Sequence, residues 1–245
     1  MTSSGLDRAR RADIEAALRG STVFSALDAA AVSALAETGI RKAWPAGAVL
    51  FLRGDPGDFL LVVSSGRVRL SFSTPQGKEL VLGHVGPREV LGEFAVIDGQ
   101  PRSADATALE PTSGVVLQRE SFLRVVSSRA ELGLALARHL SLLLRDTNYQ
   151  MESIALYDLQ ARVARFLLLT LRREYGAAIP PEAPLTLWLN QAELAAILGA
   201  SRPKINQVLQ AMLAEGLLRR DGAELICNRV RLEGFAGIDA LDEPS

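Results

Sequence analysis

The stretch NQAELAAILGASRPKINQVLQAMLAE, residues 190–215, predicts two short helices joined by a tight turn. Asn190 can cap the free amides at the start of the first helix, and Glu193 can reach back to the cap, as in a capping box. Gly199 ends that helix, because the residue after a helix often adopts a positive φ. Ser201 can cap the second helix, whose first turn tolerates a proline. This arrangement is typical of a helix-turn-helix.

The second helix of this pair has an apolar face and a polar face. Its apolar residues recur at helical spacing and are Ile205, Val208, Leu209 and Met212. Arginine can bind guanine bidentately, asparagine and glutamine can bind adenine, and lysine suits a phosphate. The residues predicted to contact DNA are Ser201, Arg202, Pro203, Lys204, Asn206 and Gln207. The alternative is an ordinary helical hairpin whose polar residues are only solvated.

The sequence on either side of the helix pair favours a DNA-binding domain. Residues 159–231 hold 10 Lys/Arg and 6 Asp/Glu, although the whole chain has a net charge of −1. A locally basic segment favours contact with phosphates. Downstream, Leu217–Leu218 and Leu225–Ile226 flank the turn dipeptide Asp221-Gly222. That pattern predicts a small β-hairpin, which would be the wing of a winged helix-turn-helix.

Upstream, a long helix is predicted over residues 130–158, which contain no proline. Residues spaced alternately 4 and 3 apart form a heptad seam, made of Leu136, Leu140, Leu143, Thr147, Gln150, Ile154 and Tyr157. The polar members Thr147 and Gln150 indicate that the seam fixes a register or meets another group. The alternative is an amphipathic helix packed on its own domain. A second helix is predicted over Leu159–Tyr175 and a loop over Gly176–Pro184.

The N-terminal half has the pattern of a β domain. Glycine- and proline-containing turns separate short β-type runs, which are Val49–Leu52, Phe59–Val63, Val68–Phe72, Leu80–Val85 and Gly114–Leu117. Several short strands at this spacing predict a sandwich or a small barrel. Ahead of them, residues 1–20 predict a short helix or a loose arm, and Val23–Gly39 predicts short helices.

Within the β domain, Gly92-Glu93-Phe94 is followed closely by Pro101-Arg102-Ser103-Ala104. A glycine allows close approach of the backbone, and a buried carboxylate can accept hydrogen bonds from sugar hydroxyls. An arginine beside a serine hydroxyl and free amides can bind a phosphate. The combination suits a ribose phosphate. The alternative is that Arg102 is only the ion-pair partner of Glu93.

Composition excludes several classes of protein. The chain has 245 residues, of which 48% are hydrophobic and 22% charged, as in ordinary globular proteins. The single cysteine, Cys227, excludes an internal disulfide and a metal cluster held by several thiolates, and it suits a reducing cytoplasm. We predict no signal peptide, membrane span or metal site. No nucleophile–base pairing or P-loop is visible, so no catalytic residues are predicted.

The two motifs together resemble a known family. Gly92-Glu93-Phe94 with Arg102-Ser103-Ala104 is similar to the phosphate-binding cassette of cyclic-nucleotide-binding domains. The order of β domain, long helix and winged helix-turn-helix resembles the cyclic AMP receptor protein (CRP/FNR-type) family of transcription regulators. The resemblance covers roughly residues 24–231. The iron–sulfur members need N-terminal cysteines, which are absent, and the haem members carry a histidine where this chain has Phe94.

The resemblance implies roles for individual residues. Glu93 would meet the ribose 2′-hydroxyl, and Arg102 and Ser103 the cyclic phosphate. Counting back from residues 155–158, which resemble the family's hinge, places Thr147 against adenine and Asn148 where the second subunit reaches in. The member best known for binding cyclic AMP has serine at the latter position, which leaves the base preference open. The two histidines of the chain, His84 and His139, are expected to be structural.

The resemblance also implies the partners. They are a homodimer paired through the long helix, a palindromic double-stranded operator and RNA polymerase, with no membrane. Arg202 matches the guanine-reading arginine of the family. Pro203 replaces an acidic base reader and Gln207 replaces a second arginine, so a different operator sequence is expected.

The sequence therefore predicts an α+β fold in four parts. These are an N-terminal arm (1–23), a jelly-roll-like β-roll that binds a cyclic nucleotide (24–129), a dimerisation helix (130–158) and a winged helix-turn-helix (159–245). The predicted function is a cytoplasmic, non-enzymatic transcription regulator with cyclic AMP as allosteric effector and no prosthetic group. The alternatives are cyclic GMP or another small effector, regulation without a ligand, a dimerising scaffold, or a nucleotide-regulated signalling protein that does not bind DNA.

Overall fold

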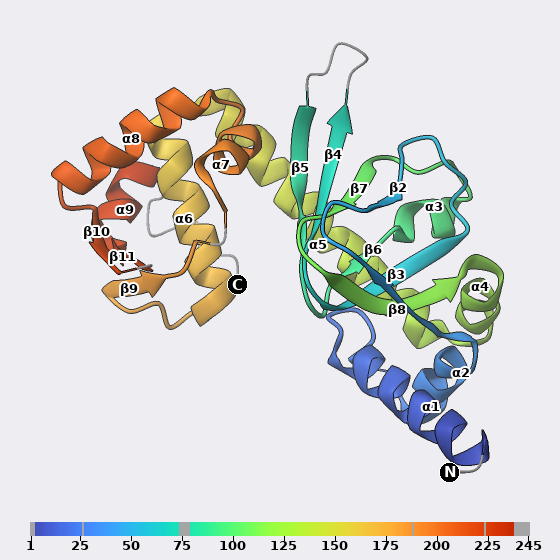
Figure 1. The fold of residues 1–245 in the computed structure, drawn as a ribbon. Helices are drawn as coiled ribbons and strands as arrows, with labels where there is room; N and C mark the ends of the chain where they lie inside the picture. Colours follow the sequence, from blue (N-terminus) through green and yellow to red (C-terminus); the bar gives the residue numbers. More distant parts are fainter. Residues whose placement is uncertain (1–2, 26, 74–78, 188, 223, 238–245) are drawn as a thin grey trace. The chain divides into compact units, whose positions relative to one another are not determined.

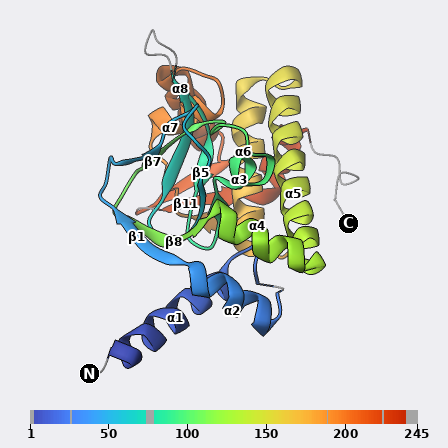
Figure 2. The ribbon, with the colours of Figure 1, turned by 90° about the vertical axis from the view of Figure 1, so that its right-hand side faces the viewer.

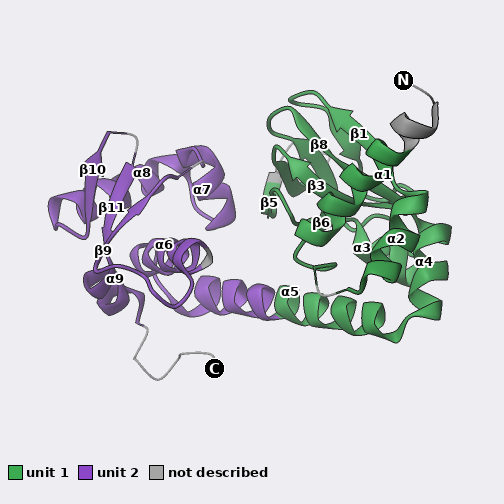
Figure 3. Ribbon diagram, turned by 90° about the horizontal axis from the view of Figure 1, so that it is seen from below, with its two compact units in different colours: residues 1–144 green, residues 145–245 purple. Residues whose placement is uncertain are grey.

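The computed structural model describes residues 3–25, 27–73, 79–187, 189–222 and 224–237. The chain divides into two compact units, Met1–Leu144 and Arg145–Ser245 (Figures 1 and 3). No helix in the described ranges is both long and apolar enough to cross a membrane.

The first unit contains two antiparallel four-stranded sheets. One has the order β1-β8-β3-β6, with bounds Ile40–Trp44, Thr112–Gln118, Phe59–Ser65 and Val90–Leu91. The other has the order β2-β7-β4-β5, with bounds Val49–Phe51, Asp105–Ala108, Val68–Ser73 and Glu79–Val85. A shared apolar core includes Trp44, Leu61, Val68 and Leu91. The predicted β-roll is confirmed, and each of the five predicted runs overlaps a strand, although Val49–Leu52 extends one residue beyond β2. The strands β1, β6 and β7 were not predicted.

Helices cover one end of these sheets. Figures 1 and 2 show α1 (Ser3–Gly20) and α2 (Ala29–Thr38) beside β1 and β8. Asp28 caps α2 by accepting a hydrogen bond from the amide of Ala31 (2.6 Å). Ile14 and Leu18 of α1 are buried in the same apolar cluster as α2. Of the two alternatives for the N-terminal segment, the structure therefore shows a packed helix over Ser3–Gly20 and not a loose arm.

Three further helices lie wholly or partly in the first unit. They are α3 (Glu93–Asp98), α4 (Arg119–Ser128) and α5 (Ala130–Leu156). Helix α5 begins against the first unit, because Leu132 and Leu136 are buried in its core. The predicted seam is therefore partly wrong at its start, since Leu136 faces its own unit. Thr147, Gln150 and Ile154 of the seam are exposed.

The second unit begins in α5 and contains α6 (Leu159–Tyr175), α7 (Gln191–Ile197), α8 (Arg202–Ala214) and α9 (Arg229–Ala236). Its sheet has the order β10-β11-β9, with bounds Leu218–Asp221, Glu224–Asn228 and Glu182–Leu185. The winged helix-turn-helix is confirmed, including the predicted bounds of α6. The predicted loop over Gly176–Pro184 is wrong at its end, where β9 begins. Pro184 is accommodated because β9 is an edge strand, where a missing amide proton costs little.

His84 gives the first unit a testable pH dependence. Burial, together with Arg67 and Arg69, lowers the pKa of His84 from 6.5 to about 4. The unfolded chain therefore takes up a proton near pH 6.5, and the folded chain only near pH 4. The stability due to the neutral histidine is fully present above pH 6.5 and is lost as the pH falls towards 4.

We expect urea unfolding between pH 7 and pH 4.5 to show a steeper loss of stability for the wild type than for His84→Gln. The difference between the two slopes isolates the histidine from the carboxylates, which titrate in both proteins. Identical slopes would contradict this assignment.

Candidate functional site

The first predicted motif forms a turn into a short helix. Gly92 precedes α3 and has a φ of 84°, a left-handed conformation that favours glycine. A Cβ at this position would overlap Nη1 of Arg102, so the glycine also provides space for that guanidinium. Glu93 is the first residue of α3 and is only 5% exposed. The second motif thus meets the first through the close contact of Gly92 with Arg102.

The guanidinium of Arg102 is almost completely enclosed, with 1% of its side chain exposed. Nη1 donates to the carbonyl oxygen of Gly92 (3.0 Å) and Nη2 to that of Phe59 (2.7 Å). The rings of Phe51 and Phe59 lie 4.2 and 4.5 Å from the guanidinium carbon. Such cation–π contacts stabilise a cation that has been removed from water. The arginine is therefore preformed in one orientation inside the β-roll.

The electrostatic partners of Arg102 and Glu93 differ. Oδ1 of Asp58, an exposed residue, lies 3.7 Å from Nη2 of Arg102, and Oε1 of Glu93 lies 3.7 Å from Nε2 of His139. Burial lowers the pKa of Arg102, and the nearby carboxylates of Asp58, Asp55 and Glu93 oppose that shift. In the described ranges, Arg102 and Glu93 do not form an ion pair with each other. The alternative in which they only neutralise one another is therefore wrong.

This arrangement can bind an anion that also carries hydroxyl groups. The Nε of Arg102 is buried and has no hydrogen-bond partner among the described residues, so this donor is unused, and each terminal nitrogen has a second hydrogen besides the one that it donates. An unsatisfied buried donor is costly and favours an added acceptor such as a phosphate oxygen. Because so little of Arg102 is exposed, an anion can reach it only when the groups that cover it move.

The remaining residues of the predicted pocket are more open. Ser103, next to Arg102, is exposed, and Phe94 is 46% exposed on α3. Thr147 and Asn148 are exposed residues of α5 and belong to the second unit. The structure thus brings Gly92, Glu93 and Arg102 together within one unit. The assignment of Thr147 and Asn148 to the same pocket stays a prediction.

Several groups that surround this site were not predicted from the sequence. Phe51 and Phe59 come from strands of different sheets, and only the register of the folded sheets brings their rings to Arg102. His139 contacts Glu93 from α5, although it was expected to be a structural histidine. The only sequence signal for this contact was the presence of a histidine in the predicted long helix.

The predicted DNA-reading helix is α8. The capping box at the start of α7 is confirmed, because the Asn190 side chain accepts from the amide of Glu193 (3.0 Å) and the Glu193 carboxylate accepts from that of Asn190 (3.1 Å). Gly199 has the expected positive φ of 61°. Ser201 occupies the N-cap position of α8, but its side chain makes no capping hydrogen bond, contrary to the prediction.

The polar face of α8 is presented to solvent. All six predicted DNA contacts are exposed, namely Ser201, Arg202, Pro203, Lys204, Asn206 and Gln207. The opposite face is anchored in the core of the second unit by Ile205, Leu209 and Met212. The side-chain amide of Gln191 donates a hydrogen bond from Nε2 to Oδ1 of Asn206 (3.2 Å), and this bond holds Asn206 against α7. A rigid helix with an open polar face is what major-groove reading requires.

A second buried arginine connects α5, α6 and α9 within the second unit. Arg165 of α6 has 3% of its side chain exposed and lies 4.2 Å from the ring centres of both Tyr149 and Tyr157. Its Nη2 donates to Glu152 (3.0 Å) and its Nη1 to the carbonyl of Ala236 (3.4 Å). We call Tyr149, Glu152, Tyr157 and Arg165 the arginine cage. This cage was not predicted from the sequence.

Other chemistry is not supported by the described residues. They contain no group of three or more His, Cys, Asp or Glu that could hold a metal ion. Burial raises the pKa of the Cys227 thiol to about 12, so the only cysteine of the chain is not a reactive thiolate at neutral pH.

A β-roll with a phosphate-binding motif, followed by a long helix and a winged helix-turn-helix, defines a ligand-responsive DNA-binding protein. Family models support both units. A cyclic nucleotide-binding domain matches residues 41–129, and a Crp-like helix-turn-helix domain matches residues 161–235.

Comparison with known proteins gives the family. The chain is 30% identical over 204 residues to a CRP-like cAMP-activated global transcriptional regulator of Mycobacterium tuberculosis, covering 83% of this chain and 91% of that protein. It is 33% identical over 202 residues to the cyclic AMP receptor protein of Thermus thermophilus, covering 82% and 90%. The structure of the c-di-GMP responsive regulator CLP from Xanthomonas campestris matches with a TM-score of 0.67 and 26% identity, covering 82% and 99%.

This chain belongs to the CRP family of transcription regulators. It is a cyclic-nucleotide-responsive, DNA-binding regulator, in a family of regulators and not of enzymes.

Proposed function

We propose that the effector of this regulator is cyclic AMP and that the first unit binds it through Glu93, Arg102 and Ser103. The observation that supports this most is the guanidinium of Arg102, enclosed by aromatic rings and aimed at the backbone of the Gly92–Glu93 turn. In the proposal, the phosphate binds Arg102 and the Ser103 hydroxyl, and the carboxylate of Glu93 accepts from the ribose 2′-hydroxyl. The sequence relatives from M. tuberculosis and T. thermophilus carry cyclic AMP in their names, which supports the choice of nucleotide, whereas the structural relative CLP is described as c-di-GMP responsive.

The base is proposed to meet Thr147, and Asn148 of the second subunit, an assignment that rests on the family resemblance. Titration by calorimetry with cyclic AMP, cyclic GMP and cyclic di-GMP tests the choice of effector. We expect cyclic AMP to bind at least tenfold more tightly than the other two, because a tenfold ratio corresponds to about one added hydrogen bond to the base. Stronger binding of either guanine nucleotide would overturn the assignment of cyclic AMP while leaving the family unchanged.

The output is proposed to be recognition of a palindromic operator by two copies of α8, with RNA polymerase as a further partner. Two recognition helices must fit major grooves about 34 Å apart, which is one turn of DNA. Binding of cyclic AMP favours one arrangement of the dimer, and it can do so only through its different affinity for the two arrangements. Access to chromosomal DNA and a single thiol are consistent with the cytoplasm as the proposed location.

The dimer is proposed to form along α5, in a register shifted from the predicted seam. Leu144 and Met151 are 61% and 67% exposed, although they lie outside the predicted seam. Together with two members of that seam they give a 3, 4, 3 spacing: Leu144, Thr147, Met151 and Ile154. An exposed apolar stripe with this spacing is typical of a paired helix. The polar Thr147 stays at its centre.

Met151→Glu is expected to weaken the dimer at least tenfold, since it places a charge in the apolar stripe, at a cost of about 1.4 kcal/mol or more. Leu142→Glu is the matched control, because Leu142 is also exposed (63%) but lies on the opposite side of the helix by spacing. Sedimentation over a range of protein concentrations measures both. Equal dissociation of the two variants would contradict the shifted register.

A further inference from the structure

We propose that His139 is a positioning residue for the nucleotide, which holds the carboxylate of Glu93 in the orientation that the ribose 2′-hydroxyl requires. The inference rests on the proposed role of Glu93. It adds that ribose recognition depends directly on a side chain of α5, the helix that leads into the second unit.

The first support is the contact itself. Nε2 of His139 lies 3.7 Å from Oε1 of Glu93, and the two side chains are 15% and 7% exposed. Nε2 is buried and makes no hydrogen bond with any described residue. A buried nitrogen without a partner is costly, and a buried carboxylate without a compensating donor is more so. Within the described residues, the contact between His139 and Glu93 offsets part of the cost of burying both groups.

The second support is that Arg102, the arginine near the pocket, is committed elsewhere. The terminal nitrogens of Arg102 donate to the carbonyls of Gly92 and Phe59, and Asp58 is its closest carboxylate. Glu93 is therefore not oriented by the arginine. A carboxylate has two oxygens with several acceptor directions, so contact of His139 with one oxygen leaves the other for a ligand hydroxyl.

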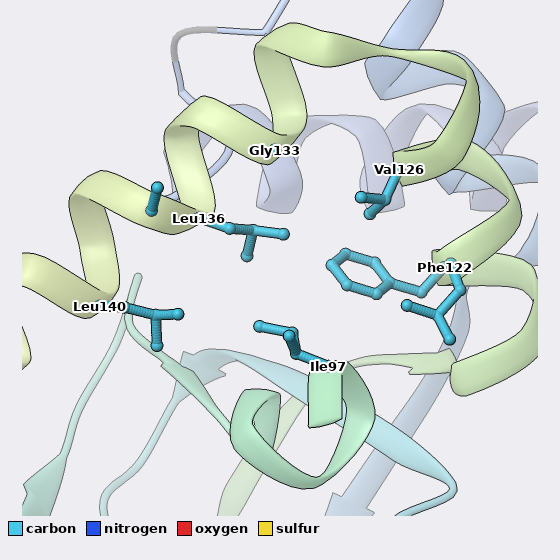
Figure 4. A pocket seen from close by; sticks show the side chains of 8 residues that line it. Ile97, Phe122, Val126, Gly133, Leu136 and Leu140 are labelled. Atoms are coloured by element: carbon cyan, nitrogen blue, oxygen red, sulfur yellow. The ribbon is translucent and has the colours of Figure 1, made fainter. Parts of the chain in front are cut away.

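The third support is the loose apolar packing where α5 faces α3 and α4. A cavity of about 230 Å³ is lined by Ile97 of α3, by residues of α4 that include Phe122, and by Leu136 and Leu140 of α5 (Figure 4). Side chains across a void lose the dispersion contacts that would fix their separation. His139 lies between Leu136 and Leu140 in sequence, so its contact with Glu93 is a polar contact between α3 and this segment of α5.

The test compares cyclic AMP with its 2′-deoxy analogue, which lacks the hydroxyl that Glu93 is proposed to bind. We expect His139→Leu to lower the affinity for cyclic AMP about tenfold, which corresponds to the loss of about one hydrogen bond. The affinity for the analogue should fall less than about twofold. His139→Gln should restore the affinity for cyclic AMP to within about threefold, because its amide can donate near the position of Nε2. An equal loss for both nucleotides, or no loss for either, would overturn the inference.

A measurement without nucleotide separates this inference from the assignment of the effector. In a double-mutant cycle with Glu93→Gln and His139→Leu, the two changes should be non-additive in the unfolding equilibrium constant by about fivefold or more. Additive effects would reject the contact, whichever nucleotide binds. If the cycle shows coupling but wild-type protein does not distinguish the two nucleotides, the proposed role of Glu93 fails, and the positioning role fails with it.

Discussion

Arg102→Leu is expected to lower the affinity for cyclic AMP by two orders of magnitude or more. A hydrogen bond to a charged group contributes about 1.5–3 kcal/mol, so the loss of two phosphate contacts corresponds to roughly 100-fold or more. Leucine keeps an apolar body between Phe51 and Phe59 but supplies no donor. Calorimetric titration measures the affinity, and circular dichroism reports whether the fold is retained.

The matched control is Arg119→Leu. Arg119 is also partly buried and its Nε donates to a backbone carbonyl, that of Val96 (3.1 Å). A loss of nucleotide binding in both variants would indicate a general loss of structure. Because Arg102 also binds the carbonyls of Gly92 and Phe59, Arg102→Lys serves as a second variant that keeps the charge. Unchanged affinity in a folded Arg102→Leu protein would defeat the proposed phosphate site.

Arg202→Ala is expected to cost about 1–3 kcal/mol at one base pair of each half-site and to relax selectivity there. The reason is that a guanidinium can bind both acceptors of guanine in the major groove. Arg202 is exposed at the first turn of α8, so truncating it leaves the core of the second unit intact. Gel-shift titration with the operator and with single-base variants measures the effect.

Lys204→Ala is the matched comparison, since Lys204 is exposed on the same turn and is expected to contact phosphate. Its loss should weaken binding to all sequences alike and reduce the salt slope by about 1. If Arg202→Ala weakens binding equally on every DNA sequence, then Arg202 is a phosphate contact and not a base reader.

Much of the second unit could be predicted because its signals are local. A capping box, a glycine at a positive φ and an apolar face all lie within residues 190–215, so each can be recognised without knowledge of distant residues. The bounds of α6 follow from the same kind of periodicity. The strand β9 was missed because its sequence EAPL has low strand propensity and contains a proline. Pairing with β11 overrides this low local propensity.

The missed parts of the first unit depend on contacts between distant residues. The strand β7, with the sequence DATA, has little strand propensity of its own and is held between β2 and β4. The strand β1, IRKAW, lies at a sheet edge and is largely exposed, so it lacks an apolar alternation. The seam of α5 was misplaced at its start because spacing alone does not tell which face of a helix its own domain covers.

The same reasoning applies to the candidate site. Glu93 and Arg102 could be singled out by residue type, but the rings that enclose Arg102 come from β2 and β3, far away in sequence. The contact between Glu93 and His139 spans α3 and α5 and leaves no local signature. Residue types thus suggest the chemistry of a pocket, while the packing of separate elements decides the orientation and partners of each group.

The arginine cage has a mechanical consequence. Residues 155–158 resemble the family's hinge. Arg165 contacts Tyr149, which precedes this segment, and Tyr157, which lies within it. The last turns of α5 are thereby stiffened against α6 and α9, and α6 packs directly on α8. We therefore expect a rotation of this end of α5 to be transmitted to α8, the proposed DNA-reading helix, with little bending between α5 and α6.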